Sequence, residues 1–288
     1  MTQARKILAF DTSSLTGIVV AFEFDERGPR IVAEWSLSLE TSRHSERLLW
    51  TIDTVLQSAG WTLKDLSALA VGVGPGSFTG LRIGITTAGM LAAQMNLPVV
   101  PISSLALLAR GAGEFLREAG ALDSKLKKSL EKTLVLACTD ATKGEWFTLM
   151  GPLAALDGCI VMPEDGLAGV WAKSVSEKTL PPEQVFEAAK QYLKKNASAR
   201  WLAVGQSVER YEAEFKTLPA KRRISLLSAF DRVRPSTLAK LASEAIQQGF
   251  SRDFSTLRPR YLRDSEAEVK LKKGLLKASP VDKTAGIA

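Results

Sequence analysis

The sequence has few histidines and cysteines, the side chains that most often bind zinc or take part in nucleophilic catalysis. Its 288 residues include one histidine, His44, and two cysteines, Cys138 and Cys159. One histidine cannot form a pair of zinc ligands. A hydrolytic triad is not evident either, because no acid is obviously placed to orient this histidine. We therefore expect no metal, no bound cofactor and no catalytic residue. Two cysteines do not make a disulfide framework, which is typical of a reducing compartment.

Long hydrophobic segments are also missing. No run approaches the ~20 apolar residues that cross a bilayer, and the first ten residues, MTQARKILAF, lack the sustained apolar stretch of a secretory signal. We expect a cytoplasmic protein without membrane association. The net charge of +7 is concentrated in Lys-Arg-Arg at 221–223 and near the C-terminus. Such charge predicts weak, salt-sensitive attraction for RNA, with plain surface solvation as the alternative.

The first part of the chain reads as a mixed α/β lobe. Three strand-like runs, 6–12, 16–24 and 31–38, follow one another at short spacing and predict an antiparallel meander. Alternating helix and strand signals then continue to residue 120, with helices expected near 45–58 and 80–95. This order predicts a mixed sheet covered by helices and matches the ribonuclease-H-like fold.

A second lobe follows a polar, charged connection. The segment 132–150 repeats the opening pattern of strand, acid, glycine turn and strand, with Asp140 matching Asp11 and Gly144 matching Gly17. We therefore predict two tandem ribonuclease-H-like lobes, the architecture of the actin-like ATPase and sugar kinase superfamily. The predicted ranges are 1–122 for the first lobe, 123–132 for a linker, 133–263 for the smaller second lobe and 264–288 for a mobile basic tail.

The stretch GVGPGSFTGLRIG, residues 72–84, carries five glycines between a strand and a helix. Such a turn often binds phosphate, because free N–H groups and the helix dipole point at an anion there. The stretch matches neither a Walker loop, since Leu81 and Arg82 follow Gly80, nor the spacing G-x-G-x-x-G. We predict a shaped structural turn without nucleotide, with Ser77 or Thr79 as helix cap. The residues assigned to this structural loop are Gly74, Pro75, Gly76, Ser77 and Thr79.

The helix after this loop has a row of small residues, with Gly89 and Ala93 beside it. Interior helical glycine costs ~0.8–1 kcal/mol relative to alanine, so the row needs a packing reason, namely the close approach of another backbone. That backbone belongs either to the chain's own sheet or to a partner helix. We assign the row to a partner interface together with apolar positions of the preceding helix. The assigned residues are Leu48, Ile52, Val55, Gly80, Gly84, Ala88 and Ala92.

Asp11 ends the first predicted strand, at an edge where ligands bind in open α/β sheets. In actin-like ATPases an acid here, followed by a glycine turn, positions phosphate and magnesium. This sequence reads FDTSS without a glycine directly after the acid. A role for Asp11 in shaping a turn therefore stands beside a metal role.

Taken together, several segments resemble the family of the bacterial tRNA threonylcarbamoyladenosine biosynthesis protein TsaB, also called YeaZ. The segments are ILAFDTSS, RHSERLLWTIDTVL, residues 72–105, TDATKGEWF and PRYLR near the end. They are spread over most of residues 5–263, and the central one is the most specific. The second lobe matches less well, since Lys143 replaces the usual arginine and Trp146-Phe147 the usual small residue and tyrosine.

This resemblance implies a degenerate nucleotide site and a non-catalytic role beside a catalytic paralogue, TsaD. TsaD transfers a threonylcarbamoyl group to tRNAs that read codons beginning with A. A TsaE-like ATPase would join through the complex, a second copy of the chain is an alternative partner, and tRNA would be bound weakly or indirectly. In the catalytic relative a histidine pair follows the strand that matches 97–103, whereas Ser104 and Leu108 stand here.

Two other functions compete with this scaffold role. An ATP-dependent small-molecule kinase of the same superfamily is the runner-up. A peptidase, suggested by older names for these relatives, is disfavoured because His44 is the only histidine.

Overall fold

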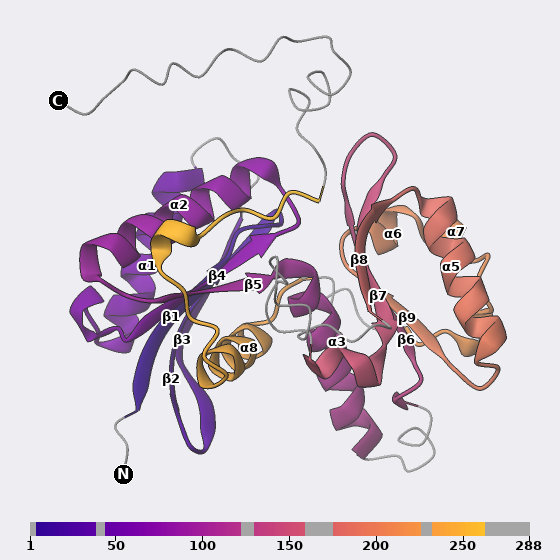
Figure 1. Cartoon of the computed structure of the whole chain (residues 1–288), viewed down its shortest axis with the longest axis horizontal. Helices are drawn as coiled ribbons and strands as arrows, with labels where there is room; N and C mark the ends of the chain where they lie inside the picture. Colours follow the sequence, from indigo (N-terminus) through magenta and orange to yellow (C-terminus); the bar gives the residue numbers. More distant parts are fainter. Residues whose placement is uncertain (1–3, 39–43, 122–129, 159–174, 226–231, 263–288) are drawn as a thin grey trace, which may run out of the picture.

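The computed structural model describes residues 4–38, 44–121, 130–158, 175–225 and 232–262 (Figure 1). Its strands are β1 (Arg5–Asp11), β2 (Thr16–Asp25), β3 (Gly28–Ser38), β4 (Ala68–Gly74), β5 (Val99–Ser103), β6 (Leu134–Asp140), β7 (Trp146–Pro152), β8 (Ser176–Leu180) and β9 (Trp201–Val204). Its α-helices are α1 (His44–Ala59), α2 (Phe78–Met95), α3 (Ser104–Ala121), α5 (Pro182–Lys195), α6 (Ser207–Arg210), α7 (Glu212–Phe215) and α8 (Pro235–Gln247). Short 3₁₀ turns are η1 (Leu63–Asp65), η2 (Leu153–Gly158), η3 (Ala220–Arg222) and η5 (Phe254–Thr256).

The first sheet has the strand order β3-β2-β1-β4-β5. β1 pairs with β2, and β2 with β3, in antiparallel fashion, whereas β4 runs parallel to β1 and to β5. The predicted meander followed by parallel strands is therefore confirmed. β1 and β4 lie in the middle and are almost wholly buried, as expected of strands that are covered on both faces.

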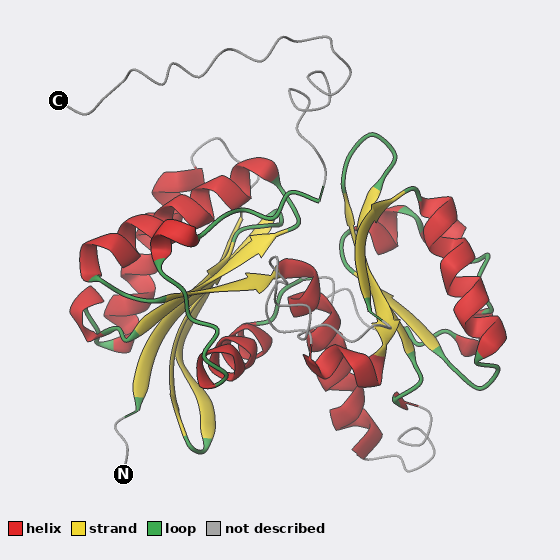
Figure 2. Cartoon of the chain, viewed as in Figure 1, coloured by secondary structure: helices red, strands yellow, loops and turns green. Residues whose placement is uncertain are grey.

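The second sheet has the order β8-β7-β6-β9 and repeats this plan on a smaller scale (Figure 2). β6 pairs antiparallel with β7 and parallel with β9, as β1 does with β2 and β4. Within the part of the chain that the structure describes, this sheet has no counterpart of β5. The fold is thus a mixed α/β fold with two sheets that share a topology.

Helices form three layers around the two sheets. α1 and α2 cover one face of the first sheet, and α5 and α7 cover the outer face of the second. α3 and α8 lie between the sheets, where their apolar residues join those of both sheets in one continuous core. The two sheets are therefore connected by buried apolar packing and not by a flexible linker alone.

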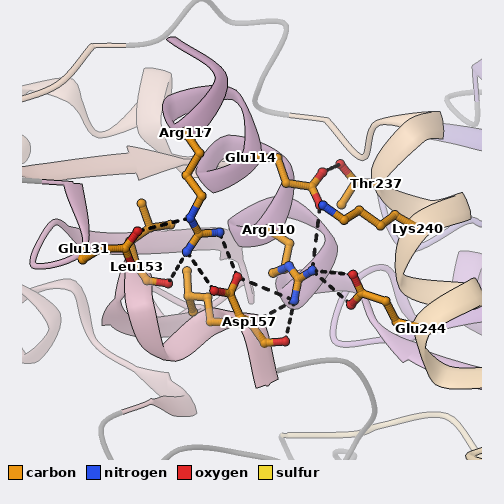
Figure 3. A network of polar contacts seen from close by, with 10 residues as sticks. Arg110, Glu114, Arg117, Glu131, Leu153, Asp157, Thr237, Lys240 and Glu244 are labelled. Atoms are coloured by element: carbon orange, nitrogen blue, oxygen red, sulfur yellow. Dashed lines mark hydrogen bonds and ion pairs between the residues drawn. The ribbon is translucent and has the colours of Figure 1, made fainter. Parts of the chain in front are cut away.

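Charged side chains strengthen this middle layer (Figure 3). Arg110 of α3 is only 4% exposed and donates to both carboxylate oxygens of Glu244 on α8 at 3.0 Å and to the backbone oxygen of Asp157 in η2 at 2.6 Å. Arg117 holds the carboxylate of Asp157 at 2.8 Å. Removing the Glu244 carboxylate should cost up to about 3 kcal/mol, because Arg110 is buried and would lose its bidentate partner, whereas the largely exposed Asp157 carboxylate contributes less.

The packing of α8 differs from the predicted lobe range. Residues 133–263 were assigned to the second lobe, yet α8 packs on β2 and β3 of the first sheet and η5 contacts α2. The chain therefore returns to the first sheet after β9. The predicted linker lies mostly outside the described residues, and the predicted tail, 264–288, lies wholly outside them.

Candidate functional site

Asp11, the acid at the end of β1 for which the sequence left a metal role and a turn role open, is buried. One carboxylate oxygen accepts hydrogen bonds from the amide and the hydroxyl of Ser13, at 2.9 and 2.6 Å. The other accepts one from the Ser104 hydroxyl at 2.6 Å. A Cβ at Gly72 would overlap this carboxylate. Asp11 is thus held by the chain's own hydroxyl and amide groups and shapes the turn after β1.

Ser104 links this acid to the glycine loop. Its hydroxyl oxygen also accepts a hydrogen bond from the Gly74 amide at 3.2 Å. Ser104 stands where the resemblance implies a metal-binding histidine in the catalytic relative. In this chain the Ser104 hydroxyl connects Gly74 of β4 to Asp11 of β1, and no histidine stands at this position.

Four amides of the glycine loop bond within the chain and so are not free to bind a phosphate. Gly74 has φ near +101°, and the Gly74–Pro75 peptide is cis. A Cβ at Gly76 would overlap the Ser13 backbone. Ser77 caps α2, its hydroxyl accepting from the Gly80 amide at 3.2 Å, whereas Thr79 is exposed. The loop amides that bond within the chain are those of Gly74, Ser77, Gly80 and Leu81.

The small residues assigned to a partner interface face the chain's own interior. A Cβ at Gly80 would overlap the carbonyl oxygen of Thr12, and one at Gly84 would overlap the Thr12 hydroxyl. Ala88 and Ala92 are 0% exposed. The backbone that approaches the row is therefore that of the turn after β1, the first of the two alternatives that the sequence left open.

The apolar residues assigned to the same interface are buried as well. Leu48, Ile52 and Val55 of α1 are at most 4% exposed and pack in the core between α1, α2 and the first sheet. Periodicity located the apolar face of each helix correctly. It was wrong about what covers that face, because the chain's own sheet does so.

The surface of these two helices carries a different set of residues. Gly89 of α2 has no atom within 4 Å of an added Cβ, and the neighbouring Met90 is 63% exposed. Ala93, one turn after Gly89, is also exposed. On α1, Leu49 is 48% and Trp50 59% exposed. The sequence signal for this surface was the pair Gly89 and Ala93 beside the longer row.

Trp50 extends this surface toward the edge of the first sheet. Its ring meets that of Trp35 on β3 edge-on, with centroids 5.9 Å apart, and Trp35 is 46% exposed. The two rings and Arg47 line a hollow of about 270 Å³. Paired exposed tryptophans are the side chains that most often dominate binding energy at protein interfaces.

The space between the two sheets near Asp11 is almost filled. The cavity there has about 10 Å³ and is lined by Ser13, Ser14, Ser104, Thr139, Gln206 and apolar neighbours. This is about the room for one water molecule. The cavity lined by these described residues is too small for a nucleotide.

The C-terminal strap, residues 257–262, contacts both lobes. The Arg260 amide donates to the Val73 carbonyl in the first lobe, and its guanidinium pairs with Glu177 of β8 at 2.6 Å. Glu177 also accepts from the Ser103 hydroxyl at 2.7 Å. Burial raises the pKa of Glu177, while Arg260 and Ser103 oppose that rise. The strap thus joins both lobes through a carboxylate that is 2% exposed.

Other reactive groups offer no site in the described part of the chain. Cys138 is buried in the second sheet, and burial raises the pKa of its thiol to about 12. No group of three or more His, Cys, Asp or Glu side chains that could hold a metal occurs among the described residues. The side chain of His44, like Cys159, lies outside the described atoms. Among the described helices, none is long and apolar enough to cross a membrane.

Solved structures and curated sequences point to the same relatives. YeaZ from Pseudomonas aeruginosa matches with a TM-score of 0.60 and 25% identity, over 89% of this chain and 99% of that one. TsaB of Bacillus subtilis is 28% identical over 92% of this chain and 96% of its own length. TsaB of Escherichia coli is 35% identical over 56% of this chain. The chain is TsaB-like.

These matches cover different shares of the relatives and of this chain. The alignment spans 57% of the Escherichia coli protein and 63% of the Haemophilus influenzae TsaB, which is 30% identical. A family model described as TsaD, tRNA N6-adenosine threonylcarbamoyltransferase, matches residues 38–119. Those residues run from the end of β3 through α3, so the similarity to the transferase family lies in the first lobe.

Proposed function

We propose that the chain is a non-catalytic subunit of the cytoplasmic system that forms threonylcarbamoyladenosine in tRNA. In this proposal it supports a TsaD-like catalytic subunit, and its fold is a pair of actin-like lobes whose nucleotide site has degenerated. The observation that carries the proposal is that both carboxylate oxygens of Asp11 accept hydrogen bonds from Ser13 and Ser104. The chain that holds Asp11 in this way is similar to TsaB and, over residues 38–119, to the transferase family.

The exposed face of α1 and α2 is the proposed contact with the catalytic subunit. Gly89 is the key residue, since a glycine inside a helix costs ~0.8–1 kcal/mol and nothing among the described residues explains it. A partner backbone approaching Gly89 and Ala93 would explain it, with Met90 and Leu49 supplying apolar area beside it. A second copy of the chain would use the same face when the catalytic subunit is absent. A TsaE-like ATPase would join the assembled pair.

Replacing Gly89 by Leu tests this contact. The position is open and leucine is a better helix former than glycine, so the free chain should melt at or above the wild-type temperature. The added side chain should weaken the complex with the catalytic subunit at least about tenfold, a moderate overpacking effect. Gln191→Leu is the matched control, because it adds the same side chain to an exposed position of α5 in the second lobe. Light scattering after size exclusion measures assembly, and tRNA modification by the pair measures its consequence.

Two outcomes would contradict the proposal. Modification of tRNA by the free chain, supplied with preformed threonylcarbamoyl-adenylate, would show that it is itself catalytic. Assembly that is unaffected by Gly89→Leu would move the contact away from α1 and α2. The kinase alternative predicts instead that the free chain hydrolyses ATP or transfers its phosphate, which a phosphate-release assay detects.

A further inference from the structure

An exposed stack of two aromatic rings and a guanidinium lies where α2 begins. Phe78 and Arg82 are one helical turn apart, and the Arg82 guanidinium lies 3.8 Å from the centroid of the Phe78 ring. The ring of Tyr261 in the C-terminal strap lies 5.5 Å from that of Phe78, and the Arg82 Nε donates to the Tyr261 hydroxyl at 3.2 Å. Two segments 179 residues apart thus meet in one arrangement, which is called here the Arg82 platform.

The Arg82 platform is open to solvent although its residues are fixed. Phe78 is 48% and Tyr261 45% exposed, and Arg82 is exposed too. Among the described residues, no carboxylate forms an ion pair with Arg82. Stacking and one neutral hydroxyl therefore orient a guanidinium whose charge no described carboxylate neutralises and whose terminal nitrogens have no acceptor among the described residues.

The other basic cluster that the sequence suggested for RNA is engaged within the chain. Arg222 donates to the backbone oxygens of Leu193 and Ala197, and Arg223 pairs with Glu212 and stacks over Trp201. Within the stretch 221–223, Lys221 is exposed, whereas Arg222 and Arg223 are half-buried. The structure thus shifts attention from this stretch to the Arg82 platform.

We propose that the Arg82 platform, Phe78, Arg82 and Tyr261, is a docking surface for a single-stranded segment of RNA. Unpaired bases stack on exposed aromatic rings and guanidinium planes, and an unneutralised arginine attracts phosphate. The net charge of +7 favours a polyanion, and the strap that carries Tyr261 also carries Arg258, which is exposed and, among the described residues, bonds to backbone oxygens alone. The inference rests on the proposed function, in which a tRNA is the substrate of the assembled subunits.

The test compares tRNA binding by the assembled pair of subunits carrying wild-type chain, Arg82→Gln or Lys221→Gln. Both variants remove one positive charge, so Lys221→Gln controls for net charge. Arg82→Gln should weaken binding about tenfold and lower the slope of log affinity against log salt by about 1, whereas Lys221→Gln should change affinity less than about twofold. Tyr261→Leu should weaken binding of a single-stranded anticodon-loop oligonucleotide more than binding of duplex RNA.

Equal effects of Arg82→Gln and Lys221→Gln would overturn the inference. So would a loss of subunit assembly in Arg82→Gln with tRNA binding by the free chain unchanged, because the platform would then contact protein; Arg82 lies two turns before Gly89 on the same side of α2. Either result leaves the proposed function standing if the wild-type pair assembles and modifies tRNA. Failure of the wild-type pair to do so would instead refute the proposed function.

Discussion

The two lobes use one topology with different packing at equivalent turns. In the first lobe the acid after the first strand, Asp11, is 1% exposed and bonded to hydroxyls from two segments. In the second lobe the side chain of the matching Asp140 is 30% exposed. It accepts a hydrogen bond from the Thr142 amide and forms an ion pair with Arg210. The same local turn is therefore a buried junction in one lobe and a surface feature in the other.

The glycines near these two turns also differ in what surrounds them. Within β4 the chain needs Gly72 because Asp11 fills the space that a Cβ would take, and directly after β9 it needs Gly205, with φ near +109°, because the Cys138 backbone lies there. Only the first lobe continues with a long helix packed directly on the turn, through Gly80 and Gly84. In the first lobe, contacts within the chain therefore fill the space beside these glycines.

The largest expected difference between the lobes concerns the two acids. Asp11→Ala should lower the free energy of unfolding by about 3 kcal/mol, because it leaves buried donors of Ser13 and Ser104 without an acceptor. Asp140→Ala should lower it by less than about 1 kcal/mol, as is usual for an exposed ion pair. Urea titrations that follow tryptophan fluorescence measure both. Similar losses would remove the contrast between a buried and an exposed turn.

The sequence was sufficient for the parts of the fold that depend on local pattern. The first-lobe strands, the long helices and the cap at Ser77 follow from apolar periodicity and turn residues. β8, Ser176–Leu180, was missed because the segment SEKTL is polar and lies at a sheet edge. The return of α8 to the first sheet has no local signal either, since an apolar helix face does not state which sheet will cover it.

The candidate site shows the same limit more sharply. Gly84, Ala88 and Gly89 are close in sequence, and period alone separates two small faces of α2 without saying which one is inside. Contact with Thr12 decides the matter, and Thr12 lies far away in the sequence, before the second strand begins. Sequence reasoning therefore recognised that α2 is closely approached but assigned to a partner a face that the chain itself covers.

The strap offers a smaller, pH-dependent test of how the lobes are joined. Burial raises the pKa of Glu177 above its ordinary value of 4.5, so the folded chain binds this proton more tightly than the unfolded chain does. The stabilisation is complete below about pH 4.5 and is lost as pH rises toward the folded pKa. Each unit by which the pKa is raised is worth about 1.4 kcal/mol.

The measurement is the free energy of unfolding between about pH 4 and pH 8 for wild type and Glu177→Gln. The wild type should lose stability relative to the variant as pH rises through the range just above 4.5, because the glutamine side chain of the variant does not titrate. The comparison uses slopes, because the substitution also changes the contacts of residue 177 with Ser103 and Arg260 independently of titration. Parallel curves would mean that folding does not raise the pKa of Glu177, so that Arg260 and Ser103 fully offset its burial.

The smallest expected effect separates the two faces of α2. Gly89→Ala should stabilise the free chain by about 0.8–1 kcal/mol, because alanine is the better helix former and the added Cβ meets no atom within 4 Å. Gly84→Ala, earlier on the inner face, should destabilise it, because its Cβ would overlap the Thr12 hydroxyl. Opposite signs in chemical denaturation would show that one glycine serves the chain's own packing and the other does not. If Gly89→Ala were instead destabilising, an intramolecular contact would already fill its surroundings, and the proposed partner surface would lose its main support. A stabilised free chain that binds the catalytic subunit less well would show that Gly89 is there for assembly, at the expense of the stability of the subunit alone.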